Sequence, residues 1–429
     1  MRLLKMGMQG TDVMELQALL RKLGYQLEVS GIFDAATEEK VKKFQALFGL
    51  REDGIVGPNT YRYLERFLLG YDIYISQKGD RIEQLAAAYK TSPQAIRIAN
   101  PGVADRIPDR TRLIIPYSTD VVDTNINYDY TVLQHDLLGL KARYPFLEIG
   151  TIGNSVLGRN LYYVKLGTGP NVVMFNAAHH SLEWITTVVL MKFIEDFAKA
   201  YAFGKPLDNY DPRAVWNAVT MYIIPMVNPD GVDLVLNGLK RDNPYYDDLL
   251  VWNQGSTDFS KTWQANNRGV DLNHNYEADW QLAKDMEITY GVTGPGPTRF
   301  GGFYPESEPE VQAMVAFTRK MQPSLVLAYH SQGKLIYWNY DDWNNARARI
   351  IARLLAFVSG YFVDETTGIA SYSGYKDWFI KEFGRPGYTI EVGKGKNPLP
   401  IAQFPEIYEA NLPLLLKAAT VTDVSNIMI

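Results

Sequence analysis

The chain has 429 residues, 46% of them hydrophobic, and a formal net charge of −5. A chain of this length and apolar content can bury more than one core, so we expect a globular protein of several domains. The nearly balanced charge, without a long run of Lys and Arg, argues against a nucleic-acid-binding protein. Cysteine is absent, which excludes disulfides and thiolate metal sites and leaves His, Asp and Glu as the strong metal ligands.

The first twenty residues contain no long apolar core and already include Asp12 and Glu15. No stretch of about 18 apolar residues follows. We therefore expect neither a leader peptide nor a membrane span. The compartment stays open, although the cytoplasm or a sporulating cell suits such a chain better than leader-dependent secretion.

Residues 1–70 predict a small domain of three helices. The segments GIFDAAT, which begins at Gly31, and GIVGPNT, which begins at Gly54, are similar, and each precedes an amphipathic helical pattern. Asp34 is expected to cap the helix whose buried stripe begins at Val41. This region, with GTDVMELQALLRKLGY ahead of the first segment, resembles the peptidoglycan-binding domain of bacterial cell-wall hydrolases. The resemblance implies that peptidoglycan is a partner.

Residues 71–118 predict a strand, two helices and a second strand, with Pro93 at a helix start and Pro101 after a helix end. This order, closed by LIIPY from Leu113, resembles a LysM module, a small α+β domain. The resemblance implies binding of glycan strands that contain N-acetylglucosamine. The alternative for both modules is a generic packing domain. The polar segment 118–125 is expected to be a linker.

Residues 126–429 alternate strand-like and helical patterns, which predicts an α/β domain. The expected fold is a mixed, mostly parallel sheet with helices on both faces. The four clearest strand-like runs are residues 171–178, 219–227, 324–330 and 387–392.

Polar residues lie at or just beyond the ends of all four runs, with Asn228–Gly231 after the second. Ligands of open α/β sheets bind beyond the carboxyl ends of the strands. His180 and Glu183 come after the first run, His330 ends the third and Glu391 lies in the fourth. Two histidines and a glutamate are a complete protein ligand set for a catalytic zinc ion. Taken alone, a His-x-x-Glu pair is a weak signal, because it arises by chance and an ordinary first turn of a helix gives the same pattern.

Six stretches, in order along the chain, resemble the metallocarboxypeptidase (carboxypeptidase A) family over roughly residues 126 to 425. They are His180–Thr186, Asn228–Gly231, Gly269–Asn273, Ser307–Glu310, Tyr329–Ser331 and Tyr388–Glu391. The resemblance implies that His180, Glu183 and His330 hold one zinc ion. It also implies that Glu391 is the general base and that Asp271 hydrogen-bonds the first histidine of the ligand set. The alternative role of Asp271 is a helix or turn cap.

Two further histidines have other expected roles. His179 has Leu182 at the spacing where a second ligand belongs, so it is expected to be structural or to line the site. His135 lies beside Asp136 in a helical pattern and is expected to be solvated.

The chain departs from the family at the arginines that bind the substrate's terminal carboxylate and the oxyanion. Leu182, Gln264 and His274 stand at those positions, while Asn273 is retained and Arg268 is the candidate for the missing charge. Leucine cannot reproduce a bidentate contact between arginine and a carboxylate. Tight capture of a free C-terminus is therefore in question.

A second departure concerns the specificity pocket of the family. Counting back from Asp377 brings Lys376 to the position that sets the pocket, and a cation there favours an acidic substrate group. The alternative is a surface lysine on a loop. The mobile tyrosine of the family falls at Ile369, so it is either absent or replaced by Tyr372.

Stem peptides of bacterial cell walls contain D-glutamate linked through its side chain, which leaves an α-carboxylate free, and often diaminopimelate. Together with two wall-binding modules, the pattern resembles the γ-D-glutamyl-diamino acid endopeptidases. The resemblance implies zinc-dependent cleavage of stem peptides between D-glutamate and the diamino acid. Two alternatives remain: a conventional zinc carboxypeptidase, and a wall-binding scaffold whose catalytic domain has decayed, which Gln264 and His274 would explain.

Overall fold

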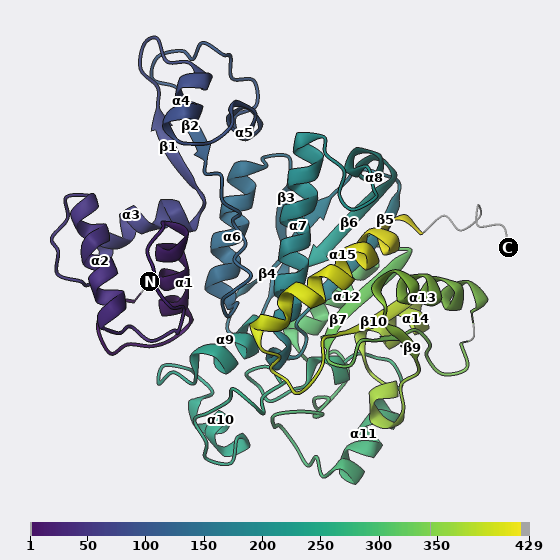
Figure 1. Ribbon diagram of the computed structural model, residues 1–429. Coiled ribbons are helices and arrows are strands. Elements are labelled where there is room, and N and C mark those ends of the chain that lie inside the picture. The colour runs from purple at the N-terminus through teal and green to yellow at the C-terminus, as the bar shows by residue number, and fades with distance from the viewer. Residues whose placement is uncertain (1, 344, 422–429) are drawn as a thin grey trace. The chain divides into compact units, whose positions relative to one another are not determined.

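The computed structural model describes residues 2–343 and 345–421. The chain forms two compact units, Met1–Glu148 and Ile149–Ile429 (Figure 1). The division falls after Glu148, whereas the sequence suggests that the third domain begins at residue 126. The difference arises because the helix that follows the linker packs against elements of the first unit. The domain boundaries at residues 70 and 118 stay predictions.

The first unit opens with the three expected helices, α1 (Thr11–Lys22), α2 (Ala35–Leu47) and α3 (Pro58–Leu68). Asp34 caps α2 as predicted, because its carboxylate accepts from the Thr37 amide at 2.8 Å. The helices enclose a small apolar core. Its fully buried side chains include Leu4, Val13, Leu20, Phe33, Val41, Phe44 and Leu64.

The repeat seen in the sequence is built on two buried glutamines. Gln17 accepts from the Gly31 amide at 2.8 Å and donates to the next carbonyl along the chain at 2.9 Å. Gln45 makes the same pair of bonds at Gly54, at 2.9 and 3.0 Å. The threonine that ends each segment accepts from the same side-chain amide. Both glycines have positive φ, 74° and 72°, a backbone conformation that residues with a side chain rarely adopt.

The second part of this unit has the predicted order of strand, helix, helix and strand. Its elements are β1 (Tyr71–Ile75), α4 (Ile82–Ala88), α5 (Pro93–Ala99) and β2 (Arg112–Pro116). The two strands pair antiparallel. The identity of this part as a LysM module stays a prediction.

The last helix of the first unit, α6 (Tyr130–Arg143), is tied to the elements before it. Its Arg143 donates to the Gly70 carbonyl at 2.7 Å. The prediction that His135 is solvated is wrong. Its Nδ1 lies 2.8 Å from Glu15 and its Nε2 lies 3.1 Å from the Tyr61 hydroxyl. Both partners are distant in sequence, so local pattern could not reveal them.

The second unit contains an eight-stranded sheet in the order β3-β4-β6-β5-β7-β10-β8-β9 (Figure 1). The strands are β3 (Glu148–Asn154), β4 (Asn160–Leu166), β5 (Asn171–Ala177), β6 (Val219–Ile224), β7 (Leu325–Ser331), β8 (Leu335–Tyr337), β9 (Phe362–Asp364) and β10 (Gly387–Val392). Strands β6, β5, β7 and β10 form the parallel centre. Antiparallel pairs join β4 to β6 and β8 to β10. The predicted mixed, mostly parallel sheet is therefore confirmed.

Helices pack on both faces of this sheet, α12 and α14 against one and α7 against the other. The helices of the second unit are α7 (Ile185–Phe203), α8 (Pro212–Ala218), α9 (Pro229–Asn237), α10 (Tyr246–Trp252), α11 (Trp280–Glu287), α12 (Pro309–Met321), α13 (Ala346–Ser359), α14 (Tyr375–Phe383) and α15 (Phe404–Thr420). Short 3-10 helices are η1 (Ser181–Glu183), η2 (Leu272–His274), η3 (Ile288–Tyr290), η4 (Gly368–Ser371) and η5 (Ile401–Gln403). On β5, Met174 packs into a cluster with α12 and α14. Val173 and Phe175, which face the opposite side, are also fully buried. Within the described residues, no helix has the length and apolar character needed to span a membrane.

Candidate active site and metal centre

The sheet brings the candidate site residues to one edge. Strands β5, β7 and β10 are parallel neighbours, so their carboxyl ends lie side by side. Glu391 on β10 is in register with His330 on β7. His180 and Glu183 follow β5 directly, in the turn that becomes η1. Residues separated by more than 200 positions thus meet where ligands of α/β sheets bind.

His180, Glu183 and His330 converge as the sequence predicted. Their potential ligand atoms lie within 4.8 Å of one another. One Glu183 oxygen is 3.0 Å from His180 Nδ1, and the other is 2.9 Å from His330 Nδ1. Two imidazoles and a carboxylate match the donors and the number of protein ligands at a catalytic zinc site. Both imidazoles present Nδ1 to the carboxylate of Glu183, so the three donors share one small space. The residues present therefore fit one zinc ion.

Charges within the ligand set support the same assignment. Burial raises the pKa of Glu183, but the neighbouring charges of His180 and His330 outweigh burial and hold that pKa below its usual range. Burial lowers the pKa of His180, and the carboxylates of Glu183 and Asp271 more than reverse this, so the pKa is raised. Glu183 is therefore held ionised between the two imidazoles.

Asp271 fixes His180 from the side away from Glu183. Its Oδ1 lies 3.2 Å from His180 Nε2, and its Oδ2 accepts from the Arg299 amide at 2.8 Å. Burial raises the pKa of Asp271, and the charges of His180 and His274 lower it further than burial raises it. Such a carboxylate orients an imidazole toward a metal. Asp271 also caps η2, so both of its expected roles are present.

Glu391 faces the ligand set with its carboxylate uncommitted. No described residue makes a hydrogen bond or ion pair with its side chain. Burial raises the pKa of Glu391 well above its usual value, and the charge of Glu183 raises it further. A carboxyl with a raised pKa can exchange a proton near neutral pH, as a general base requires.

Sequence reasoning missed Asn397. Its amide nitrogen donates to Glu183 Oε1 at 3.2 Å and to the Ser331 carbonyl at 2.7 Å. In return, the Ser331 hydroxyl donates to the Asn397 side chain at 2.8 Å. Asn397 lies 214 positions from Glu183. Its surroundings, GKGKNPLP, read as an ordinary turn, so no local signal could have identified it.

The two expected substrate-binding residues of η2 lie beside Asp271. The side chain of Asn273 accepts from the Tyr375 amide at 3.0 Å. His274 is half-buried, and its Nδ1 is buried without a hydrogen-bond partner. Tyr372 is partly buried and packs against the core cluster below α14.

The two expected cations are already paired. Lys376 lies on α14, 2% exposed, and its ammonium donates to the Asn339 carbonyl at 2.5 Å and forms an ion pair with Asp377. The alternative of a surface lysine on a loop is therefore wrong. Arg268 donates to the Tyr245 hydroxyl at 3.2 Å and forms an ion pair with Glu308 at 3.7 Å.

Gln264, which the sequence predicts to stand in place of the oxyanion arginine, is also held in place. Its side-chain oxygen accepts from the Thr298 hydroxyl at 2.6 Å, and that hydroxyl lies 3.4 Å from Asp271. His179 is fully buried, and its Nε2 bonds to the Tyr276 hydroxyl at 2.8 Å. This contact agrees with the structural role expected of His179.

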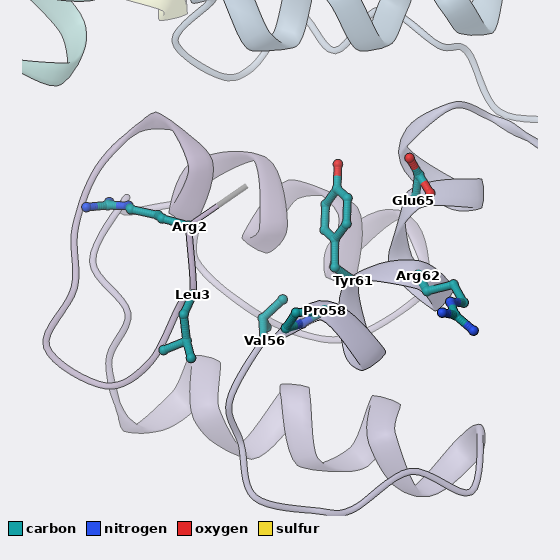
Figure 2. A pocket seen from close by; sticks show the side chains of 8 residues that line it. Arg2, Leu3, Val56, Pro58, Tyr61, Arg62 and Glu65 are labelled. Carbon is teal, nitrogen blue, oxygen red and sulfur yellow. The ribbon is translucent and has the colours of Figure 1, made fainter.

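A groove of about 320 Å³ lies in the first unit. Figure 2 shows Tyr61 between Arg2 at one end and Arg62 at the other. Arg2 is tied to Asp12 at 2.6 Å. The groove combines an aromatic ring with charged groups of both signs. Its lining residues are Arg2, Leu3, Val56, Gly57, Pro58, Tyr61, Arg62 and Glu65.

Two family models match parts of the chain. Residues 134–413 match the zinc carboxypeptidase family, and residues 9–64 match a peptidoglycan binding domain. The chain is 38% identical over 296 residues to "Gamma-D-glutamyl-L-diamino acid endopeptidase 1" of Lysinibacillus sphaericus, covering 69% of this chain and 73% of the relative. It is 35% identical to "Uncharacterized protein YqgT" of Bacillus subtilis (strain 168), covering 73% of this chain and 83% of the relative.

A solved structure shares the fold. The structure of thrombin activatable fibrinolysis inhibitor aligns with a TM-score of 0.55 at 18% identity, covering 83% of this chain and 99% of that one. Three observations support the same family. They are the mixed sheet, the two histidines and the glutamate at its edge, and the family match over most of the second unit. The chain belongs to the zinc carboxypeptidase family and is a zinc peptidase that carries a peptidoglycan-binding domain.

Proposed function

We propose that the protein is a zinc endopeptidase that hydrolyses the bond between γ-D-glutamate and the diamino acid of peptidoglycan stem peptides. One observation carries the proposal. The zinc ligands and Glu391 are retained at the strand ends, while Leu182 and His274 stand where carboxypeptidases have carboxylate-binding arginines. The relative from Lysinibacillus sphaericus, whose name states this activity, supports the same substrate.

The residues divide the chemistry in a simple way. His180, Glu183 and His330 would hold a zinc ion, which would supply a Lewis acid for the scissile carbonyl and for water. Glu391 takes a proton from the attacking water and delivers it to the leaving amine, a role that its raised pKa suits. Asp271 keeps the imidazole of His180 oriented.

The substrate side of the site is assigned to residues around η2 and α14. Asn273 and His274 lie beside Asp271, and Tyr372 lies just before α14. Lys376 lies on α14, but its ammonium is buried and Asp377 already neutralises it. A substrate carboxylate would have to compete with that ion pair. A substrate carboxylate that approached Arg268 would likewise have to compete with Glu308.

Defined muropeptides test the reaction. The wild-type protein is incubated with L-Ala-γ-D-Glu-diaminopimelate and with the same peptide extended by D-Ala, whose C-terminus is either free or amidated. We expect L-Ala-D-Glu as a product of every substrate, identified by mass spectrometry. Loss of cleavage on amidation of the C-terminus would establish a carboxypeptidase instead. Absence of turnover by protein with one zinc per chain would establish a decayed scaffold.

The first unit is proposed to hold the enzyme on the wall, with residues 1–70 contacting peptidoglycan and residues 71–118 contacting glycan strands. The catalytic domain is proposed to extend over residues 126–429. The groove around Tyr61 supports the first assignment, since an aromatic ring and flanking arginines suit sugars and carboxylates (Figure 2). Co-sedimentation of the full chain with purified sacculi should weaken for Arg62→Ala. Unchanged co-sedimentation of Arg62→Ala would exclude the groove as the binding site for peptidoglycan.

A further inference from the structure

We infer that Arg299 binds a free carboxylate of the substrate beside the scissile bond, an inference that rests on the proposed function. Arg299 lies in the segment VTGPGPTRFGG between η3 and α12. The substrate of the proposed reaction carries carboxylates on both sides of the bond that is cut. A site that discriminates such a substrate requires a cation that no protein carboxylate has already neutralised.

The backbone of Arg299 is fixed next to the metal site. Its amide donates to Asp271 Oδ2 at 2.8 Å, and the other oxygen of Asp271 lies 3.2 Å from His180 Nε2. One carboxylate thus connects the Arg299 backbone to a zinc ligand. Arg299 has φ of 65°, a conformation that non-glycine residues seldom adopt. The bond to Asp271 helps to hold it there.

The guanidinium of Arg299 is free to bind an anion. The side chain is exposed, and no Asp or Glu among residues 2–343 and 345–421 forms an ion pair with it. Its contact is with the ring of Tyr290, whose centroid lies 5.2 Å from the guanidinium carbon. Lys376 and Arg268, the two cations expected from the sequence, are in contrast already paired with carboxylates.

The neighbours of Arg299 belong to the substrate side of the site. Tyr290 lies against η4, because a Cβ on Gly368 would come within 2.7 Å of its hydroxyl. The segment η4 leads into Tyr372. Burial lowers the pKa of His274, and the positive charge of Arg299 adds to that lowering. The guanidinium of Arg299 therefore lies close enough to His274 to influence its charge, and the backbone of Arg299 is joined to the Asp271 beside His274.

The chemistry of the side chain fits a carboxylate. A guanidinium presents a planar fork of N–H groups that bonds both oxygens at once. Stacking on Tyr290 restricts the orientations of the fork, which reduces the entropy lost on binding. The ligand class is a peptide with a free carboxylate next to the scissile amide. The source is either the α-carboxylate of D-glutamate or a carboxylate of the diamino acid.

Three substrates and three variants test the inference. The substrates are L-Ala-γ-D-Glu-diaminopimelate, its analogue with the D-glutamate α-carboxylate amidated, and its analogue with the diaminopimelate carboxylates amidated. Arg299→Met removes the charge, and Arg299→Lys keeps the charge without the fork. Arg349→Met is the matched control, because Arg349 is an exposed arginine on α13. The measurements are kcat/KM and zinc content of the full chain.

Arg299→Met should lower kcat/KM for the all-acid peptide about 10- to 100-fold with zinc content unchanged. Arg299→Lys should have a kcat/KM between those of Arg299→Met and the wild type. The kcat/KM of Arg349→Met should equal that of the wild type. On one of the two amidated analogues, the wild type and Arg299→Met should have the same kcat/KM. The carboxylate that is amidated in that analogue is the one that Arg299 binds.

Equal losses on all three substrates, no loss on the all-acid peptide, or loss of zinc from Arg299→Met would each overturn the inference. A wild-type protein that cleaves none of the three peptides would instead defeat the proposed function, and the assignment of Arg299 with it. The wild-type measurements therefore separate the two failures.

Discussion

At the scale of single residues, the site depends on one buried carboxylate with three partners. Glu183 contacts both histidines of the ligand set and the amide of Asn397. A buried carboxylate without such partners would be protonated, since burial disfavours its charge. The surrounding imidazoles and amide keep it ionised and ready to bind a cation.

Replacing Glu391 tests the general base. Glu391→Gln keeps the shape of the side chain but cannot accept a proton, so kcat should fall about 10²- to 10⁴-fold. Zinc content should stay at one per chain, because Glu391 is not among the ligands. Glu409→Gln, at an exposed position of α15, is the matched control. A fall in kcat below threefold would remove Glu391 from the mechanism.

Replacing Asn397 tests the contact that the sequence did not reveal. Asn397→Ala removes the hydrogen bond to Glu183 Oε1. We expect zinc affinity to drop about 10- to 100-fold, the usual effect of losing a group that orients a metal ligand. Competition with a chromophoric chelator measures this directly. Asn209→Ala, at an exposed position, should leave the affinity unchanged. Equal affinities for the wild type and Asn397→Ala would show that the bond is incidental.

At the scale of secondary structure, the first unit repeats one device. A buried glutamine on each of α1 and α2 satisfies the backbone of the turn that enters the next helix. The turn needs a glycine with positive φ, which explains why both similar segments begin with glycine. The repeat in the sequence is thus a repeat of hydrogen bonding.

Gln45→Leu should destabilise the first unit by about 1 to 3 kcal/mol, because it strands the buried Gly54 amide without an acceptor. Hydrogen exchange of the amides in α2 and α3, followed by mass spectrometry, reports this unit. Gln77→Leu is the control, since Gln77 is exposed. Identical protection in Gln45→Leu and the wild type would contradict the role of the glutamine.

The contact of α6 with α1 should make the first unit sensitive to pH. Burial lowers the pKa of His135, but Glu15 outweighs burial and raises it above its usual value of 6.5. The contribution of His135 to stability is therefore complete below pH 6.5 and is lost as pH rises through the higher pKa of the folded state.

We expect the free energy of opening of α1 and α6, from hydrogen exchange corrected for intrinsic rates, to fall as pH rises above 6.5. His135→Gln should abolish this fall. Tyr61→Phe should retain it, because Glu15 rather than Tyr61 raises the pKa. A pH dependence in His135→Gln equal to that of the wild type would assign the effect to another group.

At the scale of the whole molecule, the two units can be observed separately. All eight tryptophans lie between Trp184 and Trp378, in the second unit. Tryptophan fluorescence therefore reports the second unit alone, and hydrogen exchange of α1 to α3 reports the first.

Removing the metal should destabilise the second unit only. A ligand present at 1,000 times its dissociation constant stabilises the folded state by about 4 kcal/mol. A chelator should therefore lower the midpoint of thermal unfolding followed by tryptophan fluorescence, and added zinc should restore it. Exchange of the amides in α1 to α3 should not change. A midpoint of thermal unfolding that is the same with and without the chelator would contradict a zinc site at His180, Glu183 and His330.

The sequence by itself determined the architecture and the centre of the site. Hydrophobic alternation located β5, β6, β7 and β10, and the order of elements in the first unit followed from caps, prolines and periodicity. His180, Glu183, His330 and Glu391 lie at or beside the carboxyl ends of parallel strands, where ligands bind, and the resemblance to the metallocarboxypeptidase family supplied their roles.

Only the tertiary structure decided which polar groups are free and which are paired. Lys376 and Arg268 carry the charges that the sequence suggested for substrate binding, but Asp377 and Glu308 neutralise them. Asn397 reaches a metal ligand from a turn with no distinguishing pattern. The physical reason is that sequence patterns record local periodicity and strand ends, whereas the partner of a side chain depends on contacts between segments far apart in the chain.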